Sequence, residues 1–486
     1  MQKKSRHIDM VSGPILPRLI AYSIPIILSG ILQLLYNAAD IVVVGRFVGK
    51  TSLAAVGSTS ALINLQVNLF VGLAVGARVV IAQYYGAKDE RAVKETTHTS
   101  ILIAIISGLL LTLIGTFCSR YFLELMATPD DVIDLSTEYL KIYFLSMPAS
   151  LIVNFGSSIL GAAGDTKRPM YIMMISGVIN VGLNLLLVIS FGLGVAGVAI
   201  ATTVSQYFSA VLILCCLIFT NDYYKLSLKL LRIHWDKLKK ILAIGIPAGV
   251  QGVIFSISNV IIQSSVNAFG STVVAGNSAA ANVEGFVYTS MNAISQATLT
   301  FTGQNVGAHK PKRIKRVYLN SLGLVTVIGL IMGTLVYIFS TPVLSLYTAD
   351  PSVIRCGQLR LFWICLPYFL CGIMDVSAGA LRGMGHSVVP MLVTILGVCG
   401  IRIVWIAVVH ATGLVDTAQK TSIKWVYVSY MISWAVTFLV HAVCVFFAQR
   451  KLQSAEEGIY PGDFDPSDAA FSEAEQNKSK TVSTEA

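Results

Sequence analysis

The chain has 486 residues, of which 55% are hydrophobic and only 12% are charged, and its formal net charge is +10. A mean hydropathy of +0.73 over this length is more apolar surface than a soluble core can bury, which excludes a soluble protein and indicates a polytopic membrane protein. The cations lie in short clusters between apolar runs. This arrangement is typical of cytoplasmic loops that face anionic lipid, so the charge does not indicate a nucleic-acid-binding protein.

The apolar runs predict an all-α fold with twelve transmembrane helices, each about 20 residues long or longer, which is the length that crosses a hydrocarbon core. In chain order the predicted spans cover residues 19–44, 54–82, 97–119, 139–161, 169–190, 194–219, 241–266, 273–302, 317–341, 357–381, 389–411 and 425–449. Lys and Arg are far more numerous in the loops on the side of the N-terminus. The positive-inside rule therefore predicts a multi-pass protein of the cytoplasmic (inner) cell membrane with both termini in the cytoplasm.

The same pattern predicts two lobes and three polar segments. The connecting segment NDYYKLSLKLLRIHWDKLKK carries six Lys and Arg residues, spaced leucines and Trp235, a composition typical of an amphipathic linker at a membrane surface. The end of the chain is polar and acidic, which predicts a disordered cytoplasmic tail. The predicted organisation is a cytoplasmic segment 1–18, an N-lobe 19–219, a basic linker 220–240, a C-lobe 241–450 and the tail 451–486.

The two predicted lobes contain related sequences. The segments FVGKTSLAAVG, QYYGAK and SSILGAAGDTKRPM recur as AFGSTVVAGNS, QNVGAH and GALRGMGHSVVPM at one offset of 221 residues, and RLIAYSIP recurs as KILAIGIP. Such self-similarity indicates duplicated halves. Because each half holds six spans, an even number, both copies share one orientation and are related by a pseudo-symmetry axis along the membrane normal. This architecture is typical of transporters, with a site near mid-membrane.

Two kinds of motif are excluded. The stretch GRFVGKT, Gly45–Thr51, looks like a phosphate-binding P-loop, but it has three residues between its glycines where four are required, no strand precedes it, and the predicted topology places it outside the cell. The eight cysteines show no CxxC pair and no Cys/His ligand spacing. We therefore predict no nucleotide binding, no disulfide framework and no zinc site.

Asp40 is the most informative single residue, because it lies within an otherwise apolar run. A carboxylate at membrane depth costs about 2.5–3.5 kcal/mol on insertion scales, and such residues usually face an aqueous cavity and bind ions or protons. A carboxylate so placed alternates between protonated and cation-bound forms. The alternative is a structural carboxylate near a helix end that is hydrogen-bonded to neighbours such as Asn37.

Two further carboxylates are predicted at membrane depth. Asp375, in CGIMDVSAGALRGMG, occupies the repeat position that matches Asn154; it either binds a cation or forms a buried ion pair with Arg402 of the next span. For Arg402 itself the structural pairing role is favoured. Glu284, in the middle of the eighth span, carries the same insertion cost and is a candidate cavity carboxylate.

Polar and aromatic residues are predicted to complete these sites. Asn180 and Asn184 are one helical turn apart, so they share a face and favour a common polar pocket, although interhelical hydrogen bonding is the commoner role of membrane asparagines. Further candidates to line an apolar, cation-tolerant substrate cavity are Tyr36, Phe70, Tyr288 and Met291, for which core packing or lipid contact is the commoner role. Asn154 is also a cavity candidate, with interhelical hydrogen bonding as the alternative.

Several segments together resemble the MATE (multidrug and toxic compound extrusion) transporters. They are IPIILSGILQLLYNAADIVVVGRFVGKTSLAAVG, LGAAGDTKRPM, INVGLNLLLVISFGLGVAGVAIATTVSQ and GALRGMG, and the resemblance covers about residues 14–450. It implies two pseudo-symmetric six-helix lobes in a V-shaped arrangement, with a cleft alternately open to each side of the membrane. It also implies export of organic, often cationic, drugs in exchange for protons or sodium ions.

The resemblance further assigns residues to cation coupling. It implies that Asp40 binds the coupling cation in the N-lobe, as a Na⁺ ligand if the protein is sodium-coupled, with Asn180 and Thr202 as polar neighbours. Asn184 stands where some relatives carry a second aspartate, which puts the proton-only version of that site in doubt. Asp375 matches an aspartate implicated in C-lobe cation binding.

The resemblance fails at one position. The acid that some relatives carry on the seventh span is missing, and Glu284 on the eighth span is the candidate to substitute for it. The choice between H⁺ and Na⁺ therefore stays open.

The sequence thus predicts a secondary active exporter of drugs or organic cations that works by alternating access, is not an enzyme, and needs no cofactor beyond the coupling H⁺ or Na⁺. Its predicted partners are small organic, cationic substrates and membrane lipids, and neither nucleic acid nor nucleotide; we expect a monomer. One alternative is a lipid-linked oligosaccharide flippase, whose pyrophosphate would need cationic cavity residues, and Arg78 and Arg402 are the evident candidates. The other is an integral membrane enzyme, for which no motif is found.

Overall fold

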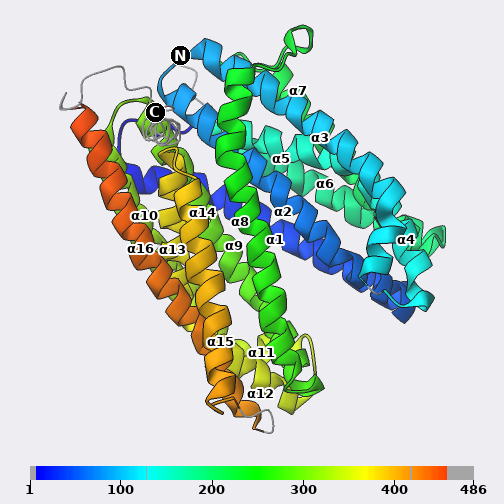
Figure 1. The fold of residues 1–486 in the computed structure, drawn as a ribbon. Helices are drawn as coiled ribbons and strands as arrows, with labels where there is room; N and C mark the ends of the chain where they lie inside the picture. The colour runs from blue at the N-terminus through cyan, green and yellow to red at the C-terminus, as the bar shows by residue number, and fades with distance from the viewer. Residues whose placement is uncertain (1–6, 127, 416–418, 457–486) are drawn as a thin grey trace, which may run out of the picture. The chain divides into compact units, whose positions relative to one another are not determined.

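The computed structural model describes residues 7–126, 128–415 and 419–456, and within these ranges the chain is helical and contains no β-strand (Figure 1). The predicted disordered tail falls almost entirely on residues 457–486, which lie outside the described residues. The helices are α1 (Ile15–Phe47), α2 (Lys50–Gly86), α3 (Glu90–Leu125), α4 (Asp130–Leu145), α5 (Met147–Ala162), α6 (Lys167–Leu185), α7 (Gly194–Ile218), α8 (Trp235–Asn267), α9 (Ser271–Gly307), α10 (Pro311–Ile338), α11 (Ser340–Ser345), α12 (Pro351–Arg360), α13 (Phe369–Gly383), α14 (Val388–Thr394), α15 (Ile401–Ala411) and α16 (Lys424–Glu456).

Each of the twelve predicted spans coincides with helix. Among the described residues, ten helical segments are long and apolar enough to cross a membrane, and the bent pair α4–α5 makes an eleventh. The helix that holds the predicted eighth span, α9, has 37 residues but is rich in Ser, Thr, Asn and Gln and also carries Glu284, which lowers its hydropathy. The prediction of an all-α, polytopic membrane fold is confirmed.

The predicted fourth span, residues 139–161, is broken rather than continuous. Helix α4 begins at Asp130 and ends at Leu145, and α5 follows at an angle of 47°. Ser146 at the junction donates its hydroxyl to Tyr143 O at 2.6 Å, and Pro148 in the first turn of α5 has no N–H to continue the ladder of hydrogen bonds. The bend therefore has a local cause in the sequence.

π-Helical turns interrupt three spans. They cover Leu186–Ser190 after α6, Leu361–Cys365 after α12 and Ile395–Gly400 after α14. Such turns are frequent at functional sites because the wider turn shifts the rotation of the residues on either side. Two of the residues singled out by the sequence, Asn184 and Arg402, lie two residues from such a turn.

The duplication is visible in the backbone. Among the described residues only Lys88 and His309 have positive φ without being glycine, at +59° and +52°, and they are 221 positions apart. Positive-φ glycines recur at the same offset, in the pairs Gly49 and Gly270, Gly164 and Gly385, and Gly192 and Gly413. A residue with a left-handed backbone conformation fixes the shape of a turn. The two halves therefore share turn geometry as well as sequence similarity.

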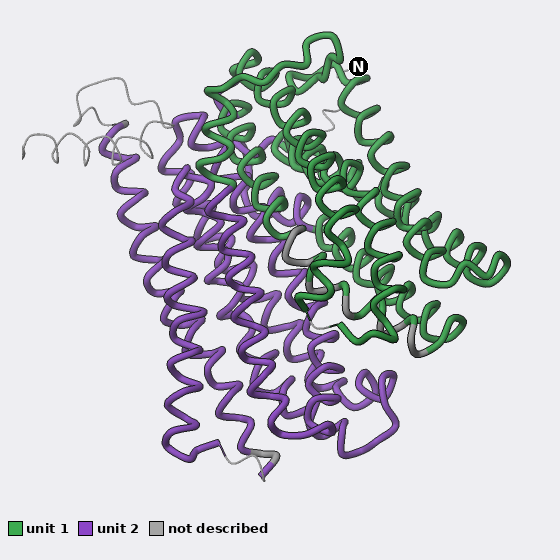
Figure 2. The backbone as a smooth tube through the Cα atoms, turned by 45° about the vertical axis from the view of Figure 1, so that its right-hand side comes forward, with its two compact units in different colours: residues 1–8, 24–85, 89–245 green, residues 9–23, 86–88, 246–486 purple. Residues whose placement is uncertain are grey.

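The chain divides into two compact units (Figure 2). Unit 1 comprises residues 1–8, 24–85 and 89–245, and unit 2 comprises residues 9–23, 86–88 and 246–486. The predicted linker, residues 220–240, falls in unit 1. The division runs through α1 next to Pro25 and through α8 next to Pro247, so both helices contribute to both units.

Candidate functional site

The polar residues of α1, α6 and α7 form one connected cluster in unit 1. Asn184 donates its side-chain amide to Asp40 Oδ1 and also lies 3.4 Å from Asn180 Oδ1. Asn180 in turn donates to Thr202 Oγ1 at 3.4 Å and to Ser205 Oγ at 3.5 Å. The cluster therefore links the three helices through four of the residues that the sequence had singled out, and it adds Ser205.

Apolar residues surround this cluster. The side chains of Val43 and Val44 on α1, Val188 after α6 and Val198 on α7 are buried together in one hydrophobic cluster. Tyr139 and Tyr143 of α4 pack in the same cluster, with their rings stacked at a centroid distance of 6.1 Å. Asp40 thus lies in a largely apolar environment with a small number of placed polar groups.

One acceptor of the cluster is left unsatisfied. Asn184 is fully buried, and its Oδ1 atom has no hydrogen-bond partner in the part of the chain that the structure describes. A buried acceptor without a donor usually costs about 1–3 kcal/mol. Asp40 and Asn184 therefore present oxygen atoms that a cation would satisfy. The side chains of Asp40, Asn180, Asn184 and Thr202 in this cluster carry oxygen atoms, the ligand type that hard cations prefer.

The other cavity candidates of unit 1 lie apart from these contacts. Tyr36 on α1 donates its hydroxyl to Met174 O of α6 at 3.2 Å, and its ring packs directly over Gly177. Asn154 on α5 donates to Ser150 O of its own helix at 2.9 Å, and Phe70 on α2 is half-buried. The sequence grouped these three residues by type, whereas the structure shows no hydrogen bond that joins the described side chains to Asp40.

Unit 2 contains a second buried polar cluster, centred on Glu284 of α9. Arg360 at the end of α12 donates to Glu284 Oε2 through Nη2 at 2.7 Å and through Nε at 3.1 Å. The Nη1 atom of Arg360 donates to Asn277 Oδ1 at 2.7 Å, and Tyr427 of α16 donates to the same oxygen at 3.3 Å. Sequence reasoning missed Arg360; its place within an otherwise apolar predicted span was the available signal.

The predicted ion pair between Asp375 and Arg402 is absent from the described residues. The Arg402 guanidinium is fully buried and lies 4.0 Å from the centroid of the Tyr430 ring, while its Nε atom donates to Ser433 Oγ at 3.0 Å. Asp375 is half-buried, and its side chain forms no ion pair among the described residues. The pair does not form because Arg402 is turned toward the aromatic face of α16.

The last two candidates belong to the core of unit 2. Met291 is fully buried, and Tyr288 packs against the same hydrophobic cluster with its ring 6.5 Å from that of Tyr368. An aromatic group made of Tyr368, Tyr430 and Trp434 continues from there to Arg402. Within this aromatic group, Tyr430 lies near the guanidinium groups of both Arg360 and Arg402.

Membrane-depth ionisable groups within duplicated bundles of helices are the hallmark of a secondary transporter. The chain belongs to the MATE family: the family model MatE matches residues 25–186 and 247–408, once in each half. The family consists of membrane transporters and not of enzymes. The two matches agree with the repeats found in the sequence and in the backbone turns.

Known proteins resemble the chain along most of its length. It is 28% identical over 440 residues to the probable multidrug resistance protein YoeA of Bacillus subtilis strain 168, covering 89% of this chain and 94% of that protein. It is 27% identical over 390 residues to a probable multidrug resistance protein NorM of Thermotoga maritima, covering 79% and 83%. A solved MATE family transporter in an outward-facing conformation superposes with a TM-score of 0.85 over 93% of this chain and 100% of that one, at 21% identity.

Proposed function

We propose that the protein is a secondary active exporter of small organic cations, driven by entry of H⁺ or Na⁺, with Asp40 as the cation-coupling residue. The single observation that carries the proposal is the Asp40–Asn184–Asn180–Thr202 cluster, a carboxylate held by amides at membrane depth with one acceptor left open. The multidrug resistance names of the relatives support the substrate class.

Coupling follows from the chemistry of the cluster. A proton or Na⁺ that enters the site neutralises Asp40 and provides a partner for the Oδ1 atom of Asn184. The hydrogen bonds between α1, α6 and α7 change as a result. Exchange then requires only that the ion and the drug bind more tightly to different conformations of the transporter. One cation that crosses the membrane releases about 2.3 kcal/mol per 100 mV, enough to drive accumulation.

The predicted topology belongs to the same proposal. We propose that both termini lie in the cytoplasm, which the distribution of Lys and Arg supports, and that the protein is a monomer of the inner cell membrane. Asp375 and Glu284 are secondary candidates: Asp375 for cation binding in unit 2, and Glu284 for the cavity, although its carboxylate is already paired with Arg360.

The flippase alternative has less support. A lipid-linked pyrophosphate needs cationic groups that are free to bind it. Of the guanidinium groups buried in unit 2, Arg360 is held by Glu284 and Arg402 is covered by Tyr430 and Trp434. Asp40, by contrast, forms no ion pair among the described residues, which favours cationic substrates.

The test is ethidium transport into or out of proteoliposomes under an imposed gradient of pH or of Na⁺. Wild type should transport against the ethidium gradient, and Asp40→Asn should lose gradient-driven transport while ethidium binding in detergent is retained. Asp131→Asn, at the exposed start of α4, is the matched control and should transport like wild type. Full transport by Asp40→Asn under both gradients would refute the coupling role.

A further inference from the structure

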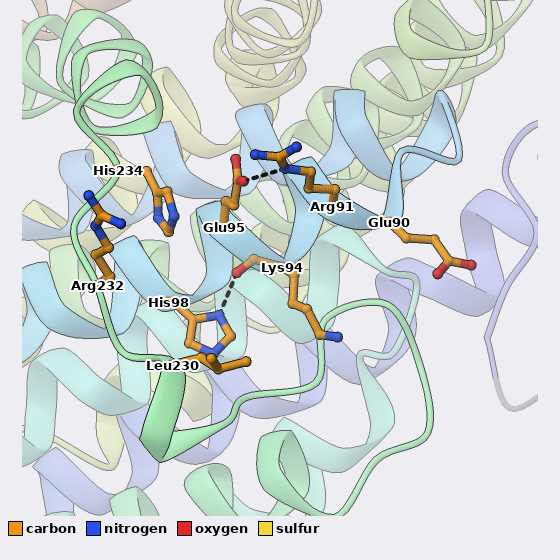
Figure 3. Close-up of a pocket in the computed structure, with 8 residues that line it drawn as sticks. All are labelled: Glu90, Arg91, Lys94, Glu95, His98, Leu230, Arg232 and His234. Atoms are coloured by element: carbon orange, nitrogen blue, oxygen red, sulfur yellow. Dashed lines mark hydrogen bonds and ion pairs between the residues drawn. The ribbon is translucent and has the colours of Figure 1, made fainter.

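Unit 1 contains a pocket of about 520 Å³ that is lined by none of the residues of the Asp40 cluster. It lies where the start of α3 meets the chain that precedes α8 (Figure 3). We call it the linker pocket. It is lined by Glu90, Arg91, Lys94, Glu95 and His98 of α3 and by Leu230, Arg232 and His234 of the following linker. Three cations and two carboxylates therefore line one pocket, and its preference for a ligand depends on which of these charges are already paired.

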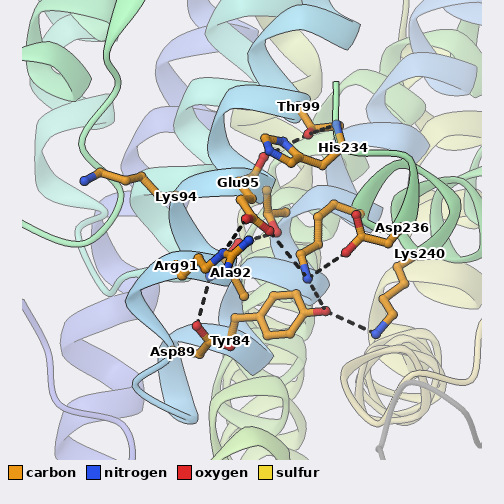
Figure 4. A network of polar contacts seen from close by, with 12 residues as sticks. Tyr84, Asp89, Arg91, Ala92, Lys94, Glu95, Thr99, His234, Asp236 and Lys240 are labelled. Carbon is orange, nitrogen blue, oxygen red and sulfur yellow. Dashed lines mark hydrogen bonds and ion pairs between the residues drawn. The ribbon is translucent and has the colours of Figure 1, made fainter. Parts of the chain in front are cut away.

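The carboxylates are largely accounted for. Glu95 accepts from Arg91 Nε at 2.8 Å and lies 4.0 Å from Lys237 Nζ on α8, in a network that also includes Asp236 and Tyr84 (Figure 4). Glu90 is exposed in the first turn of α3, and its carboxylate extends away from the other labelled side chains in Figure 3. Among the described residues, neither Glu90 nor Glu95 forms an ion pair with Lys94 or Arg232.

Three donors are uncommitted. The side chains of Lys94 and Arg232 are exposed and make no ion pair or hydrogen bond among the described residues. The ring of His234 lines the same pocket, and its Nδ1 atom is shielded from solvent without a hydrogen-bond partner in the described part of the chain. Two cations and one ring nitrogen thus line the pocket without an ion pair or hydrogen bond among the described residues, although Glu90 lines the pocket as well.

The wall of the pocket is fixed in place by hydrogen bonds. His98 is buried, its Nε2 atom accepts from Ser227 N at 3.1 Å, and its Nδ1 atom donates to Lys94 O at 2.6 Å. His234 N donates to Thr99 Oγ1 at 3.1 Å. These bonds tie the linker to α3 at both ends of the pocket, so the backbone that carries Arg232 is fixed beside α3 before any ligand arrives, with Arg232 next to His234 in Figure 3.

The pocket also lies beside the ends of predicted membrane spans. It sits at the polar ends of two candidate spans, α3 and α8. Beside it the linker exposes Leu228 and Leu230, with exposed fractions of 61% and 60%, and α8 begins with Trp235 at 69%. Exposed Leu and Trp next to Lys and Arg at the end of a span are typical of a segment that contacts lipid headgroups, because the apolar groups enter the interface while the cations meet phosphate.

We propose that the linker pocket binds the phosphate group of an acidic phospholipid, with Lys94 and Arg232 as the cationic ligands and His234 as a further donor. Arginine and lysine are the side chains that recognise phosphate, and a headgroup placed here would keep its acyl chains beside Leu228, Leu230 and Trp235. A bound lipid would hold the linker against α3, at the place where the chain passes from the first half to the second.

The test measures binding and does not depend on transport. The full chain, purified in a neutral maltoside detergent without phosphate, is titrated with short-chain phosphatidylglycerol, with phosphatidylcholine of the same chain length, and with inorganic phosphate at equal ionic strength. Affinity is followed by tryptophan fluorescence, and bound lipid is counted by native mass spectrometry. The variants are K94Q/R232Q and, as a control that removes two exposed linker charges outside the pocket, K225Q/K229Q.

We expect wild type to bind phosphatidylglycerol at least tenfold more tightly than phosphatidylcholine, K94Q/R232Q to weaken that binding by about tenfold or more, and K225Q/K229Q to leave it within about twofold. Three results would overturn the proposal. They are equal affinity of wild type for both lipids, equal loss in the two double variants, and inorganic phosphate that binds as tightly as the acidic lipid, which would assign the pocket to a soluble phosphate. The first and third of these results are measured on wild type alone, so the proposal can be refuted even if K94Q/R232Q misfolds.

Discussion

Arg360 and Glu284 form a buried ion pair within unit 2, with Nη2 and Oε2 2.7 Å apart. Arg360 stands 221 residues after Tyr139, which is the offset of the repeats and of the paired turns. Tyr139 lies in the hydrophobic cluster of unit 1 that also contains Val43, a few residues after Asp40 on α1. Equivalent positions of the two halves therefore carry a neutral phenol in unit 1 and a cation in unit 2. Among the described residues Glu284 has a cationic partner, whereas Asp40 forms no ion pair.

Separate replacement of Glu284 and Arg360 should destabilise the protein more than their joint replacement. Removal of one partner leaves the other charge buried, at a cost of about 3–5 kcal/mol, whereas replacement of both leaves none. Glu284→Met, Arg360→Met and the double variant would be compared by SDS-induced unfolding in micelles. The exposed pair Arg120–Asp134 is the control, because its double-mutant coupling should be at most about 1 kcal/mol. Additive losses at Glu284 and Arg360 would contradict a coupled pair.

Loss of the Asn184 amide should change the affinity for the driving cation without abolishing transport. Asn184→Ala removes the donor that holds Asp40, and a hydrogen bond to a charged group contributes about 1.5–3 kcal/mol, so we expect the apparent affinity for the driving cation to change by about tenfold or more. Ethidium transport would be measured as a function of pH and of Na⁺ concentration. Asn320→Ala, whose amide bonds Arg316 O in its own helix, is the control; an identical response of both variants would argue against the assignment.

Helix α6 should tolerate a methyl group at Gly182 but not at Gly177. A Cβ atom at Gly177 would lie 1.7 Å from Cζ of Tyr36, whereas a Cβ atom at Gly182 would meet nothing within 4 Å. Overpacking of this kind costs about 1–3 kcal/mol, so Gly177→Ala should lower the thermal unfolding temperature in detergent and Gly182→Ala should not. The loss should shrink in a Tyr36→Ala background. A loss of the same size there would show that the contact with Tyr36 is not its cause.

Asp222 should make stability depend on pH only in the acidic range. Burial by itself would raise the pKa of Asp222, but hydrogen bonds from His7, from Tyr223 N and from Tyr85 hold that pKa below its ordinary value of 3.8. A carboxylate with a lowered pKa stabilises the folded state at neutral pH, and this stabilisation is lost as the pH falls through and below 3.8.

The measurement for Asp222 is the unfolding temperature of wild type and Asp222→Asn between pH 7 and pH 3. The difference between the two should be constant near neutrality and vanish at the acidic end. Asp134→Asn, at an exposed surface pair, should follow wild type throughout. A difference between wild type and Asp222→Asn that grows as the pH falls would have the wrong sign.

The amino-acid sequence by itself was enough to predict a polytopic membrane protein, the positions of the twelve spans and the duplication, and to single out Asp40 as a candidate site residue. These features depend on hydropathy, on the spacing of identical letters and on the cost of one carboxylate in an apolar run, all of which are properties of the chain read locally. The break at Ser146 and Pro148 was also within reach of the sequence, since proline removes a donor wherever it stands.

Only the tertiary structure decided which polar groups meet. Asn184 reaches Asp40 across 144 positions, and Glu284 finds Arg360 across 76, whereas Arg402 turns to Tyr430 and Ser433 instead of Asp375. Those choices depend on how far each helix is rotated about its axis, and the rotation is set by the packing of neighbouring helices and by the π-helical turns beside Asn184 and Arg402. A local sequence pattern does not determine that rotation. The sequence could therefore indicate which residues belong to polar sites, but it could not indicate which residues they contact.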